Sequence, residues 1–538
     1  MGNFCHVFRF LSKKFIYLLS IIILFIISIF NISHSTLTYS SWYPLIFRNN
    51  LYKTGLLFIL SFFFVACLYY FVKNINEKSV FLSIVLFNII SLIVKVVIIL
   101  SFNNSPIADS WDIFNGVNTL LFTSDKGTLY IGNYFAMYPQ QLGMVSILSP
   151  LAFLFKWDIN AYYYFQAFLI QLTIVLLTLC SFKLKGLKVS LVTTILLNLF
   201  IPNLFVPFLI YGDLYSYFFI ALLYTLYLYT KNCESKYTKV LIVFVSLILI
   251  SLAYLARIST VVFIIAFFIV YFINRKLNIK YFVILALTLI FVTNVYPMNT
   301  NLYNKGDVGL GEYEFPSNTW IRLGVSYSWF DQVTPGFHDQ RIDWDFKSVG
   351  YNKSKMSKIN HEVISARLNQ MFKTKEWIHF YKKKIVILWT DPDFEMMSYI
   401  APFKGEHLSD PSELQKVELH GSGATNLKAN NIIGEMIQKY YYPLRDFEKM
   451  YLYATLFIGF LVFVNRKDES DEKLFIRLLL IGFFALHLLI EIKSRYIFVF
   501  YSSFIFIISL NFYEEFEKFL NLIQKIKSNT NIRLGDKK

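Results

Sequence analysis

Two carboxylates three residues apart follow a strongly apolar segment of the chain. Asp109 and Asp112 lie in "NNSPIADSWDIFNGV" (103–117), directly after "VFLSIVLFNIISLIVKVVIIL", which ends at Leu100. A spacing of three places both side chains on one face of a helix, whereas an extended segment would point them to opposite faces. A carboxylate at this position can take a proton from an attacking hydroxyl group, so the pair is a candidate for general base chemistry.

Ionisable residues also occur at the ends of other apolar segments. Asp213 lies in "LIYGDLYS", Arg257 in "YLARIST", and Glu491, Lys493 and Arg495 in "LIEIKSRY". Charged groups beside a membrane are costly unless they face water, a partner or a substrate, so we expect them to form one site with the two aspartates. Each residue alone also fits a helix cap or a membrane interface, and for Asp213 we favour an N-cap.

The elements that position these residues are predicted to be membrane helices. The chain has 538 residues, of which 56% are hydrophobic and only 16% are charged, which excludes a soluble globular protein. Its apolar residues form continuous blocks of roughly 16 to 22 residues, the length of a helix that crosses about 30 Å of hydrocarbon. Blocks without alternation also exclude a β-barrel. We therefore predict an all-α membrane protein with about twelve spans (11–13), at 15–32, 55–72, 79–100, 161–180, 188–208, 214–230, 238–256, 258–274, 279–296, 450–464, 474–491 and 495–511.

The predicted orientation depends on the segment "QQLGMVSILSPLAFLF" (140–155), which is short and contains Pro150. If this segment does not cross the membrane, "FKLKGLK", "TKNCESKYTK", "NRKLNIK", "NRKDESDEK" and the Lys-rich C-terminus all fall on the side of Lys13 and Lys14. Because short cytoplasmic loops are enriched in Lys and Arg, we predict that 140–155 is a juxtamembrane helix and that both termini are cytoplasmic. No small-residue cleavage site follows the first apolar block, so we interpret it as a retained anchor.

This topology divides the chain into four parts: an N-terminal transmembrane module (1–296) with a candidate catalytic loop at about 101–158, a small outer domain of α or mixed α/β structure (297–449), C-terminal transmembrane helices (450–511) and a basic cytoplasmic tail (512–538). Turn sequences such as "TPGFHD" and the helix-like run "KMSKINHEVISARLNQMFKTKEWIHFYKKK" predict that the outer part folds. Its acidic and basic residues balance, so the net charge of +16 lies in the rest of the chain. That distribution favours membrane orientation over nucleic-acid binding.

The aspartate loop carries a family resemblance. The run "SPIADSWDIFNGVNTLLF…GTLYIGNYFAMYPQQLGMVSILSPLAFLF" resembles the first outer loop of the GT-C superfamily glycosyltransferases, which include protein O-mannosyltransferases and bacterial aminoarabinose and cell-wall polymer glycosyltransferases. "YLARIST", "SNTWIRLGVSYSWFDQVTPGF", "KKKIVILWTDPDF" and "EIKSRY" resemble later motifs of that superfamily, in the same order. The chain departs from these relatives by two extra spans before the loop and by "DSWD" in place of a compact "DD" or "DE" pair. The choice between Asp109 and Asp112 therefore stays open, although the spacing in "PIAD" favours Asp109.

The resemblance implies a cell-membrane enzyme that moves a sugar from a polyprenyl-phosphate donor to an acceptor on the outer face. Acceptors of the relatives include cell-surface polymers, lipids and proteins. Asp109 would act as general base or would orient the acceptor, with Asp112 in support. The residues that would bind the departing lipid phosphate are Arg257, Arg495 and Lys493. The residues that would line the substrate cavity are Asp213, Tyr138 and Glu491.

The sequence predicts no cofactor. A divalent metal ion is the alternative, at the pair Asp391 and Asp393. Asp391 and Asp393 in "WTDPDF" have the chemistry of metal ligands, but "DPD" is also ordinary turn chemistry. None of the following histidines has the HxxxH or HExxH spacing of a zinc site: His338, His361, His379, His407 and His420.

A membrane transporter or a flippase of lipid-linked sugars is the alternative function. Twelve spans with scattered polar residues also fit that class. Transporters usually bind their substrate near the bilayer midplane on helices broken by Gly or Pro. The predicted spans are mostly unbroken and their charges lie at the helix ends, so we favour the enzyme.

Overall fold

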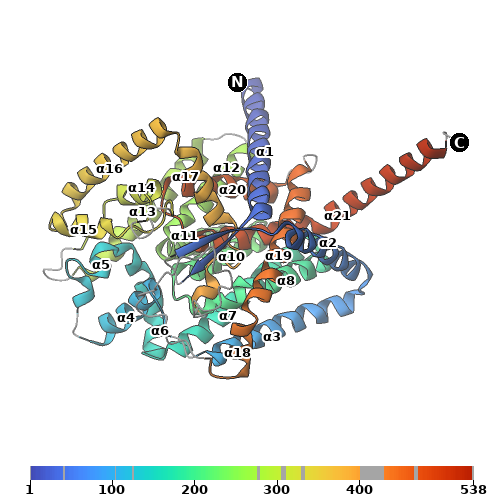
Figure 1. Ribbon diagram of the computed structural model, residues 1–538. Coiled ribbons are helices and arrows are strands. Elements are labelled where there is room, and N and C mark those ends of the chain that lie inside the picture. The colour runs from blue at the N-terminus through green and yellow to red at the C-terminus, as the bar shows by residue number, and fades with distance from the viewer. Residues whose placement is uncertain are drawn as a thin grey trace.

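The computed structural model describes residues 2–39, 43–102, 105–123, 126–274, 279–304, 310–328, 334–399, 429–465 and 470–535. Within these residues the chain is almost entirely helical, with one two-stranded antiparallel hairpin (Figure 1). This architecture confirms the predicted all-α class. His407 and His420 lie outside the described residues.

Several helices are long and apolar enough to cross a membrane, which indicates a multi-pass membrane protein. In the described part of the chain there are eight: α1 (Gly2–Ser33, from Leu11), α2 (Leu51–Asn74), α3 (Glu77–Ser101), α7 (Ile159–Lys185), α11 (Lys236–Ala256), α13 (Ile279–Tyr303), α19 (Tyr441–Val464) and α21 (Phe498–Gly535). The most apolar stretch of helix α21 is 83% buried, whereas that of α3 is only 22% buried. The C-terminal part of α21 projects from the body of the molecule (Figure 1). The exposed apolar side chains of the peripheral helices are suited to contact with lipid.

One predicted span is broken in the structure. Residues 188–208 form α8 (Leu187–Leu199), α9 (Pro202–Phe205) and the 3₁₀ turn η3 (Val206–Phe208), with a bend of 64° between α8 and the segment after it. Pro202 stands at the start of α9, where its fixed φ suits a helix that begins anew. Counting this pair as one span gives up to nine.

Three further predicted spans are helices that do not reach the length and apolarity of the others: α10 (Gly212–Thr230), α12 (Val261–Asn274, after η4, Ile258–Thr260) and α20 (Asp471–Leu489). Helix α12 has 14 residues and therefore extends about 21 Å, less than the hydrocarbon thickness. The total of twelve spans stays a prediction.

The loop after α3 folds into short helices. These are α4 (Asp109–Phe122), η1 (Gly127–Leu129), α5 (Tyr134–Met137), η2 (Pro139–Gln141) and α6 (Leu142–Phe155). Helix α6 has 14 residues and contains Pro150, so its length agrees with the prediction that 140–155 does not cross. It packs against α4, which begins at the first candidate carboxylate.

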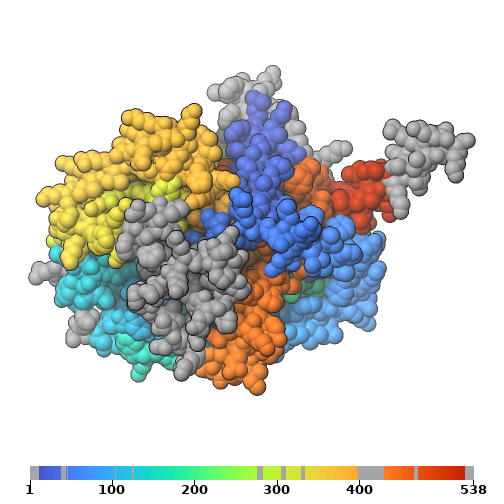
Figure 2. All heavy atoms as spheres, in the orientation of Figure 1, coloured from blue at the N-terminus to red at the C-terminus, as the bar shows by residue number. Residues whose placement is uncertain are grey.

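The long polar insertion is helical in its described part: α14 (Asn318–Val325), α15 (Arg341–Ser348), α16 (Lys353–Thr374), α17 (Trp377–Trp389), η5 (Met396–Tyr399) and α18 (Ile432–Lys439). The predicted helical run is divided by Lys375, whose φ of 57° ends α16 in the left-handed region. Phe315, Leu323, Phe346 and Met356 form a small core that also contacts Tyr138 of the loop after α3. In Figure 1, α14, α15 and α16 lie at the left of the molecule, on the same side as α4. In Figure 2 this side carries the yellow and cyan atoms.

The hairpin was not anticipated from the sequence. Strands β1 (His34–Tyr39) and β2 (Tyr43–Arg48) occupy the connection between the first two predicted spans. The backbone nitrogen of Thr36 donates to the carbonyl oxygen of Thr390 at 3.2 Å, which attaches the hairpin to the end of α17. The sequences "HSTLTY" and "YPLIF" are rich in β-branched and aromatic residues. This composition favours strands over a loop.

Candidate functional site

Asp109 forms an ion pair with Arg495, a residue 386 positions later in the chain. A guanidinium nitrogen of Arg495 donates to Asp109 Oδ2 at 2.8 Å. The arginine side chain is 1% exposed and the aspartate side chain 29% exposed, so a substrate has access to the carboxylate and little to the guanidinium. Ala108, with φ 49°, precedes Asp109 and turns the chain sharply into α4.

A second ion pair joins Arg257 to Asp213, with Nε and Oδ1 3.1 Å apart. Asp213 lies in the first turn of α10 and is fully buried, while Tyr211 occupies the N-cap position. The N-cap role favoured for Asp213 is therefore wrong, because its carboxylate is oriented toward the arginine at the end of α11. Gly212 permits this arrangement, since a Cβ there would overlap the carbonyl oxygen of Ala256.

Two tyrosine rings join the two ion pairs into one cluster. The guanidinium carbons of Arg257 and Arg495 lie 5.1 and 4.7 Å from the centre of the Tyr211 ring. They lie 4.5 and 5.8 Å from the Tyr496 ring. The aromatic faces stabilise two cations that would otherwise repel each other in a buried setting. Asp109, Asp213 and both arginines thus meet at one place, as the sequence predicts.

The segment between α20 and α21 presents Glu491, Lys493 and Arg495 to this cluster. The Tyr496 hydroxyl donates to Glu491 Oε2 at 3.2 Å. Lys384 of α17 is 1% exposed and its ammonium donates to the carbonyl oxygens of Gly324, Leu488 and Ile490 at 2.6, 3.0 and 2.7 Å. The lysine thereby holds α14, α17 and the end of α20 together, although sequence reasoning gave it no role.

The two carboxylates of α4 have different electrostatic surroundings. Burial raises the pKa of Asp109, but the positive charges of Lys493 and Arg495 outweigh burial and hold that pKa below its usual value. Burial, followed by the negative charge of Asp109, raises the pKa of Asp112 to about 6. The pair therefore combines one carboxylate held ionised with one that readily takes up a proton near neutral pH.

Tyr138 and His338 border the carboxylates from the loop after α3 and from the polar insertion. The Tyr138 ring packs against Phe315 and Trp320, with centroids 5.3 and 6.1 Å away. Burial lowers the pKa of His338, but the hydrogen bond that its imidazole donates to Asp343 and the negative charge of Glu491 raise that pKa overall. The sequence indicates no role for His338, because it lacks the spacing of a zinc ligand, whereas the structure places it beside Asp343 and Glu491.

Asp391 and Asp393 lie in a turn, as their sequence indicates, and pair with Arg445 of α19. The guanidinium nitrogens are 3.3 and 3.0 Å from the two carboxylates, and the Ser494 hydroxyl donates to Asp391 at 2.8 Å. Ser494 precedes Arg495, so this buried group adjoins the Asp109 cluster. Among the described residues no three His, Cys, Asp or Glu side chains are arranged to hold a metal ion.

Lys95 is an ionisable residue inside a membrane-spanning helix that sequence reasoning passed over. It is fully buried in α3, and its ammonium donates to Ser91 Oγ at 2.7 Å and to Gln171 Oε1 at 2.8 Å. The Gln171 amide in turn donates to Asn88 at 2.6 Å and to Asn198 at 3.2 Å, beside the break after α8. The signal was available in the sequence, because a lysine in the middle of an apolar block is rare.

No protein-family model, no curated protein and no solved structure matches the chain. The functional interpretation therefore depends on the geometry of the cluster and on the resemblance of the aspartate loop.

Proposed function

We propose that the protein is a GT-C type glycosyltransferase that moves a sugar from a polyprenyl-phosphate donor to an acceptor hydroxyl group. One observation carries the proposal: Asp109, partly exposed at the start of α4, lies next to a second carboxylate and pairs with a buried arginine that shares its tyrosine neighbours with Arg257. Carboxylates beside cations at the end of a membrane helix suit a reaction that removes a proton and releases a phosphate.

The proposed reaction is a single displacement. The acceptor hydroxyl loses its proton to a carboxylate while its oxygen bonds to the anomeric carbon, and the bond from that carbon to the phosphate oxygen breaks. The electron pair leaves with the lipid phosphate, to which Arg257 and Lys493 donate, while the buried Arg495 adds positive charge nearby without direct contact. One displacement inverts the sugar, so no carboxylate nucleophile is required.

The sequence favours Asp109 as the base, and the electrostatics favour Asp112. A general base works best when its pKa lies near the operating pH, which suits the raised pKa of Asp112 better than the lowered pKa of Asp109. We therefore assign proton transfer to Asp112 and orientation of the acceptor hydroxyl to Asp109. Tyr138 and Glu491 complete the cavity wall in this proposal, and the fully buried Asp213 positions Arg257 through their ion pair.

The test of the function is lipid mass spectrometry of the purified protein combined with a transfer assay. We expect a polyprenyl-phosphate sugar to co-purify, and we expect its sugar to move to an added membrane-surface extract. The opposite outcome is that the wild type co-purifies with the lipid but never transfers its sugar, and moves the intact lipid between the leaflets of a vesicle. That outcome would show that the protein is a flippase and not a transferase.

Two observations favour that second candidate. The break at Pro202 and the polar group around Lys95 within the membrane-spanning part resemble the broken helices and midplane polar residues of transporters. Lys95→Met separates the functions, because the Lys95 ammonium donates to Ser91 and Gln171 and to no residue of the Asp109 cluster. If the protein is a transferase, we expect Lys95→Met to transfer sugar at the wild-type rate. If neither the wild type nor Lys95→Met transfers sugar, and the variant no longer moves lipid between leaflets, the protein is a transporter.

A further inference from the structure

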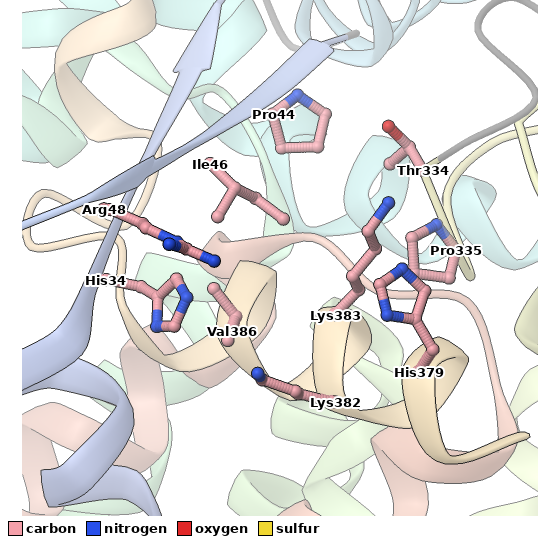
Figure 3. A pocket seen from close by; sticks show the side chains of 10 residues that line it. All are labelled: His34, Pro44, Ile46, Arg48, Thr334, Pro335, His379, Lys382, Lys383 and Val386. Carbon is pink, nitrogen blue, oxygen red and sulfur yellow. The ribbon is translucent and has the colours of Figure 1, made fainter.

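A pocket of about 410 Å³ lies between the β1–β2 hairpin and α17 (Figure 3). Its basic residues come from both elements: His34 and Arg48 from the two strands, and His379, Lys382 and Lys383 from the helix. The pocket is separate from the Asp109 cluster, because Lys384, which contacts the cluster's loop, occupies another face of α17.

The basic side chains are brought together by regular secondary structure. His34 and Arg48 are direct cross-strand partners, so they share one face of the hairpin. His379, Lys382 and Lys383 follow the three- and four-residue spacing that places side chains on one helical stripe. In Figure 3, Arg48 and Ile46 of the hairpin lie opposite Lys382 and Lys383 of α17, and the Lys383 ammonium is directed toward Pro44 and Thr334.

The positive charges have no acidic counterpart in the pocket. None of the described residues that line it is Asp or Glu, and no ion pair among the described residues involves Arg48, Lys382 or Lys383. Burial, and then the charges of Lys382 and Arg48, lower the pKa of His34. Like charges opposite one another destabilise a fold, and a concave surface concentrates their field.

The pocket also lies at the end of a membrane helix. His34 is the first residue after the apolar stretch of α1, Leu11–Ser33. The side chains of Ile46 and Val386 add apolar surface next to the basic groups. A ligand with a compact negative group and an adjoining less polar part therefore fits both the charge and the position.

We propose that this pocket binds a phosphate group. Arg48, Lys382 and Lys383 donate charge-assisted hydrogen bonds to its oxygens, for which the guanidinium and ammonium groups are suited. The phosphate comes either from the headgroup of an anionic membrane lipid or from a free phosphorylated molecule, since both offer the same oxygens.

The test compares two sources of phosphate with the full chain in lipid nanodiscs. In one arm, inorganic phosphate is titrated by calorimetry into protein in phosphatidylcholine discs. In the other, native mass spectrometry counts phosphatidylglycerol retained from mixed phosphatidylcholine and phosphatidylglycerol discs. The test variant combines Arg48→Gln, Lys382→Gln and Lys383→Gln. The matched control combines Lys355→Gln, Lys358→Gln and Lys373→Gln, which removes the same charge from the exposed surface of α16.

We expect binding in at least one arm to weaken by at least about tenfold in the pocket variant and by less than about twofold in the control. A response to phosphatidylglycerol alone assigns the pocket to lipid headgroups, and a response to inorganic phosphate assigns it to free phosphates. Absence of binding in both arms, or equal losses in the two variants, would overturn the proposal.

Discussion

Asp109 and Asp112 lie on the same turn of α4, yet their surroundings shift their pKa values in opposite directions. The sequence alone does not show which carboxylate accepts the proton, because a spacing of three places both on one face of the helix. The distinction comes from Lys493 and Arg495, which approach Asp109 from the far end of the chain. Their positive charge stabilises one carboxylate in its ionised form and leaves the other as the better proton acceptor.

The first prediction at this scale concerns the pH dependence of transfer. With Asp112 as base, kcat/KM rises with pH and levels off above about 6, because only the ionised carboxylate takes a proton. Asp112→Asn should lower the rate by about 100-fold to 10,000-fold. Asp109→Asn should move the inflection to lower pH, since it removes the negative charge that helps to raise the pKa of Asp112.

Donor binding measured separately in each variant controls for loss of the substrate site. An Asp112→Asn protein that transfers at the wild-type rate would return the base role to Asp109. An inflection that stays at the same pH in Asp109→Asn would show that the two carboxylates are not coupled.

The second residue-scale prediction concerns the arginines. Arg257→Lys and Arg495→Lys should each weaken donor binding by about 10-fold to 100-fold, because an ammonium replaces neither the planar fork nor the stacking on Tyr211 and Tyr496. Arg341→Lys, at a half-exposed pair with Asp339, is the matched control and should bind donor normally. Normal donor affinity with Lys at both cluster positions would remove phosphate binding as their role.

At the scale of elements, α17 connects the parts of the site. One face lines the basic pocket, and Lys384 on another face donates to three carbonyl groups of α14 and the end of α20. Gly336 has φ 70°, and a Cβ there would meet Lys384 Cε at 2.6 Å, so the approach of this side chain depends on the glycine. The helix therefore fixes the segment that carries Glu491 and Arg495.

We predict that Lys384→Met lowers both the melting temperature and the transfer rate. Each buried carbonyl group left without a donor costs about 1–3 kcal/mol, and the displaced segment no longer presents Arg495 to Asp109. Burial lowers the pKa of Lys384 to about 7 in the folded protein, so the unfolded chain holds its proton to higher pH. The wild type should therefore gain stability relative to Lys384→Met as the pH rises from about 7 toward 10.

Thermal unfolding of both proteins across this pH range makes the comparison, and Lys373→Met on the exposed surface of α16 controls for loss of a charge. If Lys384→Met unfolds at the same temperature as the control, the three hydrogen bonds do not hold the segment.

At the scale of the whole molecule, the predicted orientation puts 297–449 and Asp109 on the outer face and both termini in the cytoplasm. Single cysteines at Thr123 and at Lys373, each on a cysteine-free background, test this prediction. An impermeant thiol reagent should label both positions in intact cells, and a cysteine at Lys239 should be labelled only after lysis. Labelling of the first two positions from opposite sides would contradict the topology.

The sequence by itself determined that the main elements are apolar helices, and it identified the ionisable residues to test. Continuous apolar blocks require helices, because a backbone in hydrocarbon must satisfy its own hydrogen bonds. Charged residues at the block ends marked Asp109, Asp213, Arg257 and Arg495, which the structure brings together. Local pattern was sufficient here, because a membrane restricts where an ionisable side chain can lie.

Only the tertiary structure decided the pairing of these residues and the elements that support them. The contact of Asp109 with Arg495 spans 386 positions, and no local pattern encodes which arginine meets which aspartate. The bend after α8, the hairpin against α17 and the burial of Lys384 likewise depend on packing between distant segments. The pKa difference between Asp109 and Asp112 follows from the same cause, since it is set by charges that the fold delivers from elsewhere in the chain.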